Sequence, residues 1–281
     1  MKKIVIFMLF GLIAFCSCTK NNVVETPSEN INELDALKLE LLELNSTLPP
    51  SKDVITKAPW WKYLLVGVAD AVGGFIPGGS VSTAISASTL AWTIVKEEKK
   101  SSESSTGSST STPAENPSLN PIESALVNVG GDGEVHNKVI VNIFEKYGEE
   151  MFSLPENELN NEISKEVSLQ TGEPLEVVKI TPQQSVTIHN VVDAYVTSAT
   201  VDEFMCKVSP TLANPELSEV VEVILSGYER VDISTDNGTY EAAVNKTIEK
   251  SKISTTSKDC LKSVSSVANA STRLWNVNSL E

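Results

Sequence analysis

The chain has few of the residues from which catalytic and metal sites are usually built. Its 281 residues include only 2 histidines and 4 cysteines, and none of them has the HxxxH or CxxC spacing of a metal site. A Gly-x-Ser-x-Gly nucleophile elbow and a Cys/His dyad motif are also absent. We therefore expect no cofactor and no enzymatic activity.

Basic residues are also scarce. The chain has 22 Lys and Arg against 37 Asp and Glu, which gives a formal net charge of -15. Nucleic-acid phosphates and anionic lipid surfaces both attract basic proteins. This charge therefore argues against nucleic acid as a partner, and against membrane binding through charge.

Alternating strand patterns are missing as well, and the apolar residues recur instead at helical spacing. The sequence therefore predicts an all-α protein, in which Leu175–Ile180 is the best candidate for a short strand. Capping signals, such as Thr181 before Pro182 with Gln184 three residues after the cap, agree with this fold. We expect helices near residues 29–45, 59–74, 80–95, 135–150, 156–170, 182–199, 201–208, 215–229, 238–252 and 256–277.

The N-terminus has the pattern of a secretory signal. Two lysines precede an apolar run from Ile4 to Phe15, which is too short to span a bilayer comfortably. The run ends in Cys16, Ser17 and Cys18 and resembles a bacterial lipoprotein signal, whose final cysteine becomes the lipidated first residue. Small Ser17 before Cys18 favours Cys18 over Cys16 as the site of lipid (palmitate) attachment. A cleaved signal without a lipid is the alternative.

The stretch from Trp60 to Val95 is apolar and rich in small residues. Asp70 is its only charge between Tyr63 and Val95, and Pro77 should break it into two helices. Small residues at helical spacing, including Gly67 and Gly74, predict close contact between these two helices. We therefore expect a glycine-rich helical hairpin over residues 59–96.

Two placements of this hairpin, inside the protein or at a membrane, are compatible with the sequence. Trp60 and Trp92 lie near its ends, where aromatic side chains often anchor membrane segments. Each half, however, is shorter than the ~20 residues that span a bilayer, and Asp70 would need a partner in lipid. The hairpin could be packed against protein, or it could lie in a bilayer or at its surface.

Composition divides the chain into five parts. The Ser- and Thr-rich segment 97–121 has almost no apolar residues and should be a disordered linker. We expect a signal peptide at 1–17, a tether and amphipathic helix at 18–58, the hairpin at 59–96, the linker at 97–121, and a helical bundle domain at 122–281.

Four patterns could carry chemistry. His136 with Asp132 and Glu134 could contribute to a metal or acid–base site, although a structural histidine is the simpler interpretation. The segment 232–238 is similar to a calcium loop, but its glycine and its twelfth residue do not fit, so a turn before a helix is favoured. The glycines of 130–133 lack the spacing of a phosphate loop. Cys206 and Cys260 could form a disulfide or remain buried thiols.

The order of features resembles that of uncharacterised lipoproteins of Bacteroidetes-type bacteria. The resemblance consists of the WW…AD-A-x-G-G stretch at 60–74, Asn120-Pro121, the glycine to His-Asn segment at 130–137, and the Ser-rich end at 265–275. The resemblance implies a location in the cell envelope and an order of segments along the chain, and it implies no activity.

Together these features predict a lipid-anchored envelope protein, with the outer membrane favoured and a binding or structural role. Its membrane contact would be the lipid, and its protein partner is not identified by the sequence. Two other classes remain: a membrane-active protein whose hairpin inserts into a bilayer, and a metal-dependent hydrolase built around His136.

Overall fold

The computed structural model describes residues 31–49, 59–104, 129–231 and 235–275 of the chain. These residues form an all-α protein without strands, as the sequence predicts. The α-helices are α1 (Ile31–Ser46), α2 (Pro59–Gly74), α3 (Val81–Ser104), α5 (Gly131–Tyr147), α6 (Glu156–Thr171), α7 (Leu175–Val178), α8 (Pro182–Val196), α9 (Val201–Val208), α10 (Ser218–Tyr228), α11 (Thr239–Lys250) and α12 (Thr255–Trp275). Three short 3₁₀ helices lie between them, at Gly148–Ser153, Ser209–Thr211 and Pro215–Leu217.

Two local predictions from the sequence are wrong. Leu175–Ile180 is not a strand, because Leu175–Val178 forms the single turn of α7 directly after Pro174. The linker does not begin at residue 97, because α3 continues to Ser104 through Glu and Lys residues that favour helix. The capping box of α8 is confirmed: Thr181 and Gln184 exchange side-chain to backbone hydrogen bonds.

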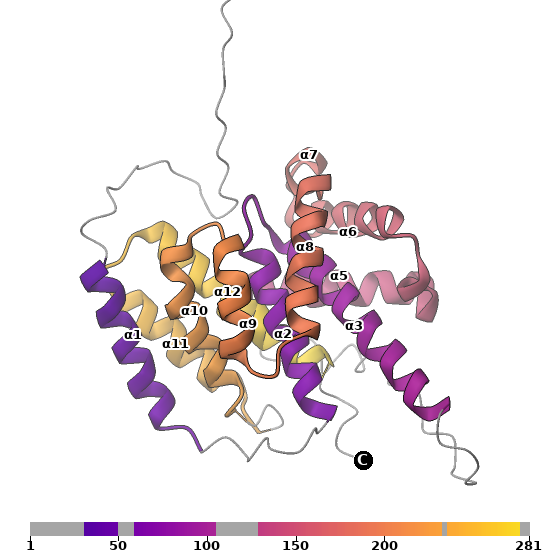
Figure 1. Cartoon of the computed structure of the whole chain (residues 1–281). Helices are drawn as coiled ribbons and strands as arrows, with labels where there is room; N and C mark the ends of the chain where they lie inside the picture. The colour runs from indigo at the N-terminus through magenta and orange to yellow at the C-terminus, as the bar shows by residue number, and fades with distance from the viewer. Residues whose placement is uncertain (1–30, 50–58, 105–128, 232–234, 276–281) are drawn as a thin grey trace, which may run out of the picture.

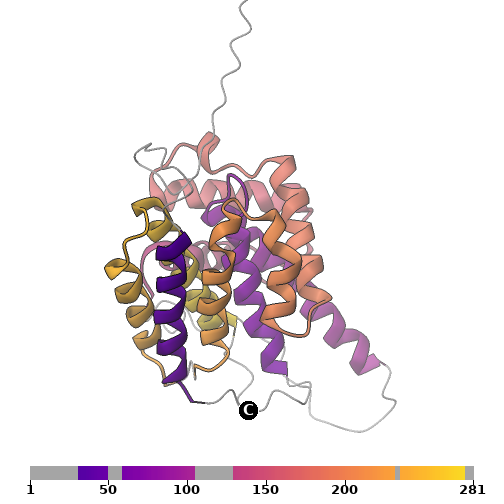
Figure 2. The same ribbon diagram turned by 60° about the vertical axis from the view of Figure 1, so that its left-hand side comes forward.

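α2 and the start of α3 lie at the centre of the bundle, and the C-terminal end of α3 extends beyond it (Figures 1 and 2). α2 packs against α3, α8 and α12, whereas α3 also contacts α5, α6 and α8. The long C-terminal helix α12 packs in turn against α2, α5, α10 and α11. The hairpin and α12, which are far apart in the sequence, therefore share the middle of the molecule.

Helix α1 closes one side of this core. Its apolar face buries Leu34, Leu37 and Leu41 against α10 and α11. At its end the buried side chain of Asn45 donates to the carbonyl of Val223 at 2.7 Å and accepts from the hydroxyl of Tyr240 at 2.8 Å. These bonds fix the end of α1 on the bundle.

Residues on both sides of the segment 105–128 belong to one hydrophobic core. The predicted boundary between a hairpin module and a bundle domain therefore does not separate two cores. The segment 105–128 itself lies outside the described residues, and so do the predicted signal peptide and tether over residues 1–30.

The small residues of α2 make the close contacts, but not at the expected positions. A Cβ added at Gly73 would lie 2.6 Å from the Cβ of Ala87, so Gly73 is where α2 meets α3. A Cβ at Gly67 would lie 2.8 Å from the side-chain oxygen of Thr272, so this glycine faces α12. At Gly74 the nearest atom would be at an ordinary 3.5 Å. The stripe therefore lets α2 approach two helices.

Trp92 lies inside the protein and is not an interfacial anchor. It is 4% exposed, and its ring stacks on Trp275 at the end of α12, with ring centroids 4.4 Å apart. The side chain of Trp60 is outside the described part. Among the helices that the structure describes, none is both long and apolar enough to cross a membrane.

Candidate functional site

A cluster of polar side chains is buried at the centre of the bundle, around the one charge of the hairpin. Asp70 of α2 and His136 of α5 are both fully buried, with Oδ2 and Nε2 3.5 Å apart. The hydroxyl of Ser271, from α12, donates to the same Oδ2. Three helices far apart in the sequence thus each supply one member of an acid–imidazole–hydroxyl cluster.

Further buried polar groups hold these side chains in place. Asn137 accepts at Oδ1 from Nδ1 of His136 at 2.9 Å, and its amide nitrogen donates to the carbonyl of Ala270. This bond places the proton of the imidazole on Nδ1, so that a neutral ring would present Nε2 to Asp70 as an acceptor. Trp275 donates to the hydroxyl of Ser88 at 2.9 Å, and this serine also lowers the pKa of Asp70.

Burial dominates the electrostatics of the cluster. Removal from water raises the pKa of Asp70 above its ordinary value, while the nearby imidazole of His136 and the hydroxyl of Ser271 lower it. Oδ1 of Asp70 and Nε2 of His136 have no hydrogen-bond partner among the described residues. The cluster is therefore an incompletely satisfied buried network whose protonation state affects stability.

The cluster has the residue types of a catalytic site but not its access. Its hydroxyl bonds to the carboxylate and not to the imidazole, so the imidazole does not activate it as in a hydrolase triad. All three side chains are closed off from solvent. In this arrangement they can hold three helices together or store a proton, but they cannot touch a substrate.

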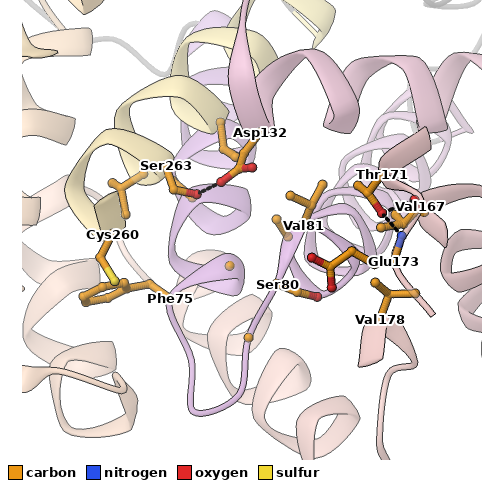
Figure 3. Close-up of a pocket in the computed structure, with 16 residues that line it drawn as sticks. Phe75, Ser80, Val81, Asp132, Val167, Thr171, Glu173, Val178, Cys260 and Ser263 are labelled. Atoms are coloured by element: carbon orange, nitrogen blue, oxygen red, sulfur yellow. Dashed lines mark hydrogen bonds between the residues drawn. The ribbon is translucent and has the colours of Figure 1, made fainter. Parts of the chain in front are cut away.

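An open cleft lies beside the cluster, between the turn that joins α2 to α3, the start of α5, the end of α6 and α12 (Figure 3). Its volume is about 120 Å³. Asp132 and Glu173 provide its carboxylates, and the thiol of Cys260 lies in its wall. Six larger apolar side chains line it: Phe75, Val81, Val167, Val178, Val264 and Val267.

The cleft and the cluster share the same three helices. Residues four apart on a helix are neighbours on one face. Each cluster residue is four positions from a cleft residue, in the pairs Asp70 with Gly74, His136 with Asp132, and Ser271 with Val267. Part of the cleft lining is therefore about one helical turn from the buried cluster.

The structure separates the residues of the predicted metal site. Asp132 accepts a hydrogen bond from Ser263 in the cleft, and Glu134 pairs with Lys138 on the surface of α5. His136 faces Asp70 instead of either acid. The described residues contain no group of three His, Cys, Asp or Glu side chains that could hold a metal ion.

The loop that is similar to a calcium site acts as a helix start. Asp236 accepts from the backbone amides of Gly238 and Tyr240 at 3.2 and 3.1 Å, and it pairs with Arg273 of α12. Residues 232–234 of this loop lie outside the described part. The preferred interpretation of the sequence, a turn before α11, agrees with these bonds.

The glycine-rich segment 130–133 begins α5, and Gly133 allows α5 to approach α12. A Cβ at Gly133 would lie 2.4 Å from the carbonyl oxygen of Ser266, and the backbone amide of Gly133 donates to the hydroxyl of the same serine. Gly133 therefore serves helix packing, whereas a Cβ at Gly130 would meet nothing within 4 Å. The packing also sets Asp132 at the edge of the cleft.

The two cysteines outside the signal region are thiols in the structure, not a disulfide. Cys206 is exposed on α9 and Cys260 is buried on α12 beside the cleft. Cys18, the predicted site of lipid attachment, and its rival Cys16 lie outside the described residues.

Sequence reasoning identified Asp70 and His136 separately but not as a pair. Asp70 stood out as the one charge in an apolar stretch, which is the usual sequence signal of a buried polar cluster. Ser271 and Glu173 gave no such signal, because one lies among many serines and the other in an acidic chain. Comparison of the chain with protein-family models, with curated proteins and with solved structures finds no match.

Proposed function

We propose that the chain is a lipid-anchored protein of the bacterial cell envelope with a non-catalytic binding role. The observation that carries this proposal is the contrast between the two sites. Asp70, His136 and Ser271 are closed to solvent, whereas the cleft beside them is open and offers both carboxylates and apolar walls. Ligand sites are typically concave and largely apolar, with a few polar groups that set orientation.

The anchor in this proposal is Cys18, with residues 19–30 as the link to α1. Cys18→Ser should abolish labelling of the expressed protein by a radioactive or alkyne-tagged palmitate precursor. Cys16→Ser is the matched control and should keep the label. Loss of the label in Cys16→Ser alone would assign the anchor to the other cysteine, and labelling of neither wild type nor variants would contradict the anchor.

Enclosure of the hairpin weighs against the membrane-active alternative. Insertion would require α2 and α3 to leave α5, α8 and α12, against which they bury most of their described side chains. It would also expose Asp70 to lipid without His136 and Ser271. The binding role requires no such rearrangement.

Blocking the cleft tests the binding role. Val81 lies at the start of α3 and is partly exposed, so Val81→Trp should fill the cleft from its mouth without entering the core. Leu39→Trp is the control, because Leu39 is exposed on α1, which lines no part of the cleft. After chemical crosslinking in intact cells, wild type and Leu39→Trp should form the same covalent adducts with a partner. Val81→Trp should not form these adducts. An unchanged set of adducts in Val81→Trp would contradict a role for the cleft.

A further inference from the structure

The charges of the cleft all have one sign. Asp132 and Glu173 line it, and no Lys, Arg or His does. The carboxylate of Asp132 accepts from the hydroxyl of Ser263, and neither carboxylate forms an ion pair with a base among the described residues. The two acids come from different elements, the first turn of α5 and the segment between α6 and α7. Figure 3 shows Glu173 with its carboxylate turned toward Val81 and Ser80.

The larger apolar side chains of the cleft lie between and around these acids. They are valines from α3, α6, α7 and α12 and the ring of Phe75, with the hydroxyls of Ser80, Thr171 and Ser263 among them. An anion would meet two like charges here, and a strongly hydrated inorganic cation would lose water against valine side chains. A neutral apolar molecule would leave both carboxylates unmatched. The lining therefore favours a cation that carries a short apolar chain.

The size of the cleft limits the length of that chain. Its volume of about 120 Å³ is smaller than the roughly 150 Å³ cavity that is known to accept benzene in an engineered protein core. A chain of about four carbons is close to this limit. A primary ammonium group also donates three hydrogen bonds, which suits two carboxylates and the nearby hydroxyl of Ser80.

We infer that the cleft binds a primary alkylammonium group, with its carbon chain between the valines and its nitrogen between Asp132 and Glu173. This inference rests on the proposed binding function and names the chemistry of its ligand. The same group occurs in a free alkylamine and in the side chain of a lysine that a protein partner presents.

Titration of the mature chain with four small probes tests the inference. Calorimetry and thermal melting should show binding of n-butylammonium, at least tenfold weaker binding of n-butanol, and no binding of butyrate. The fourth probe, Nα-acetyl-lysine methylamide, distinguishes the two sources. If it binds as tightly as n-butylammonium, the source is a lysine side chain. If it binds much more weakly, the source is a free amine.

Glu173 and Glu176 are both exposed, and only Glu173 lines the cleft, so Glu176 provides the control. Glu173→Gln should weaken n-butylammonium binding about tenfold, because it removes one charge-assisted contact. Glu176→Gln, on α7 and outside the cleft, should leave binding unchanged. Since both side chains are exposed, neither change should affect folding.

Three results would overturn the inference: n-butanol binding as well as n-butylammonium, binding of neither probe, or Ca²⁺ displacing the ammonium probe at equal concentration. These results leave the proposed function intact if Val81→Trp still removes the adducts formed in cells. If the ammonium probe binds while the adducts are unaffected by Val81→Trp, the proposed function fails and the chemistry of the cleft stands.

Discussion

Nε2 of His136 and Oδ2 of Asp70 lie 3.5 Å apart in a part of the core that solvent does not reach. One residue belongs to the hairpin of α2 and α3, and the other belongs to α5, after the segment 105–128. Their contact joins regions that composition alone assigns to different domains. The pair therefore lies at the electrostatic centre of the bundle, and it shows that the two regions belong to one core.

The two members of this pair should differ in their effect on stability. His136→Gln removes the imidazole that faces Asp70 and leaves the buried carboxyl group with one polar partner fewer, which costs about 1–3 kcal/mol. Asp70→Asn should cost clearly less, because the amide has nearly the same size and carries no charge. Urea unfolding at pH 7 gives both values, and equal losses would contradict the electrostatic account.

The pH dependence of stability follows from the direction of the Asp70 shift. Burial raises the pKa of Asp70, so the folded state holds its proton more tightly than the unfolded state, whose value is near 3.8. This contribution to the free energy of unfolding is complete below the unfolded pKa and is lost as the pH rises through the folded pKa. The free energy of unfolding of Asp70→Asn should therefore increase relative to that of wild type as the pH rises above about 4. A difference in free energy of unfolding between the two proteins that stays constant from pH 4 to pH 7 would contradict the raised pKa of Asp70.

Adjacent glycines of α2 should respond in opposite ways to the same change. Gly73→Ala places a methyl group 2.6 Å from the Cβ of Ala87, and overpacking of this kind costs about 1–3 kcal/mol. Gly74→Ala meets nothing closer than 3.5 Å and gains up to about 1 kcal/mol of helix propensity. The melting temperature of Gly73→Ala should be lower than that of wild type, and the melting temperature of Gly74→Ala should be higher. Similar melting points would mean that α2 and α3 are not in close contact.

The single core predicts that neither half of the chain folds alone. A fragment beginning at residue 122 lacks α2 and α3, so it exposes the faces of α5 and α12 that pack on them. Its circular dichroism should show no cooperative melting. Addition of a fragment over residues 28–104 should restore it. Independent cooperative melting of the C-terminal fragment would restore the boundary that composition indicates.

The sequence predicted most of the helices because helical periodicity and capping signals are local. The ends of α2 and α9, the break at Pro77 and the capping box at Thr181 all depend on residues within one or two turns. The end of α3 was missed because its last residues are charged and serine-rich, which is compatible with both a linker and an exposed helix.

Tertiary relationships could be predicted much less well. The small residues of α2 indicated a close helix contact, but not that Gly67 would face Thr272, almost at the other end of the described chain. The carboxylate of Asp70 needed a partner, but its partner depends on how α5 and α12 pack. The cleft could not be predicted for the same reason, since Asp132 and Glu173 line one cleft only in the folded molecule.

Hydrogen–deuterium exchange of the mature chain, with and without lipid vesicles, tests whether the hairpin is the core of one bundle. If it is, the amides of residues 66–74 and 82–92 are among the slowest to exchange, and vesicles leave their rates unchanged. Fast exchange of these amides in the absence of vesicles, with protection only when lipid is added, would contradict it.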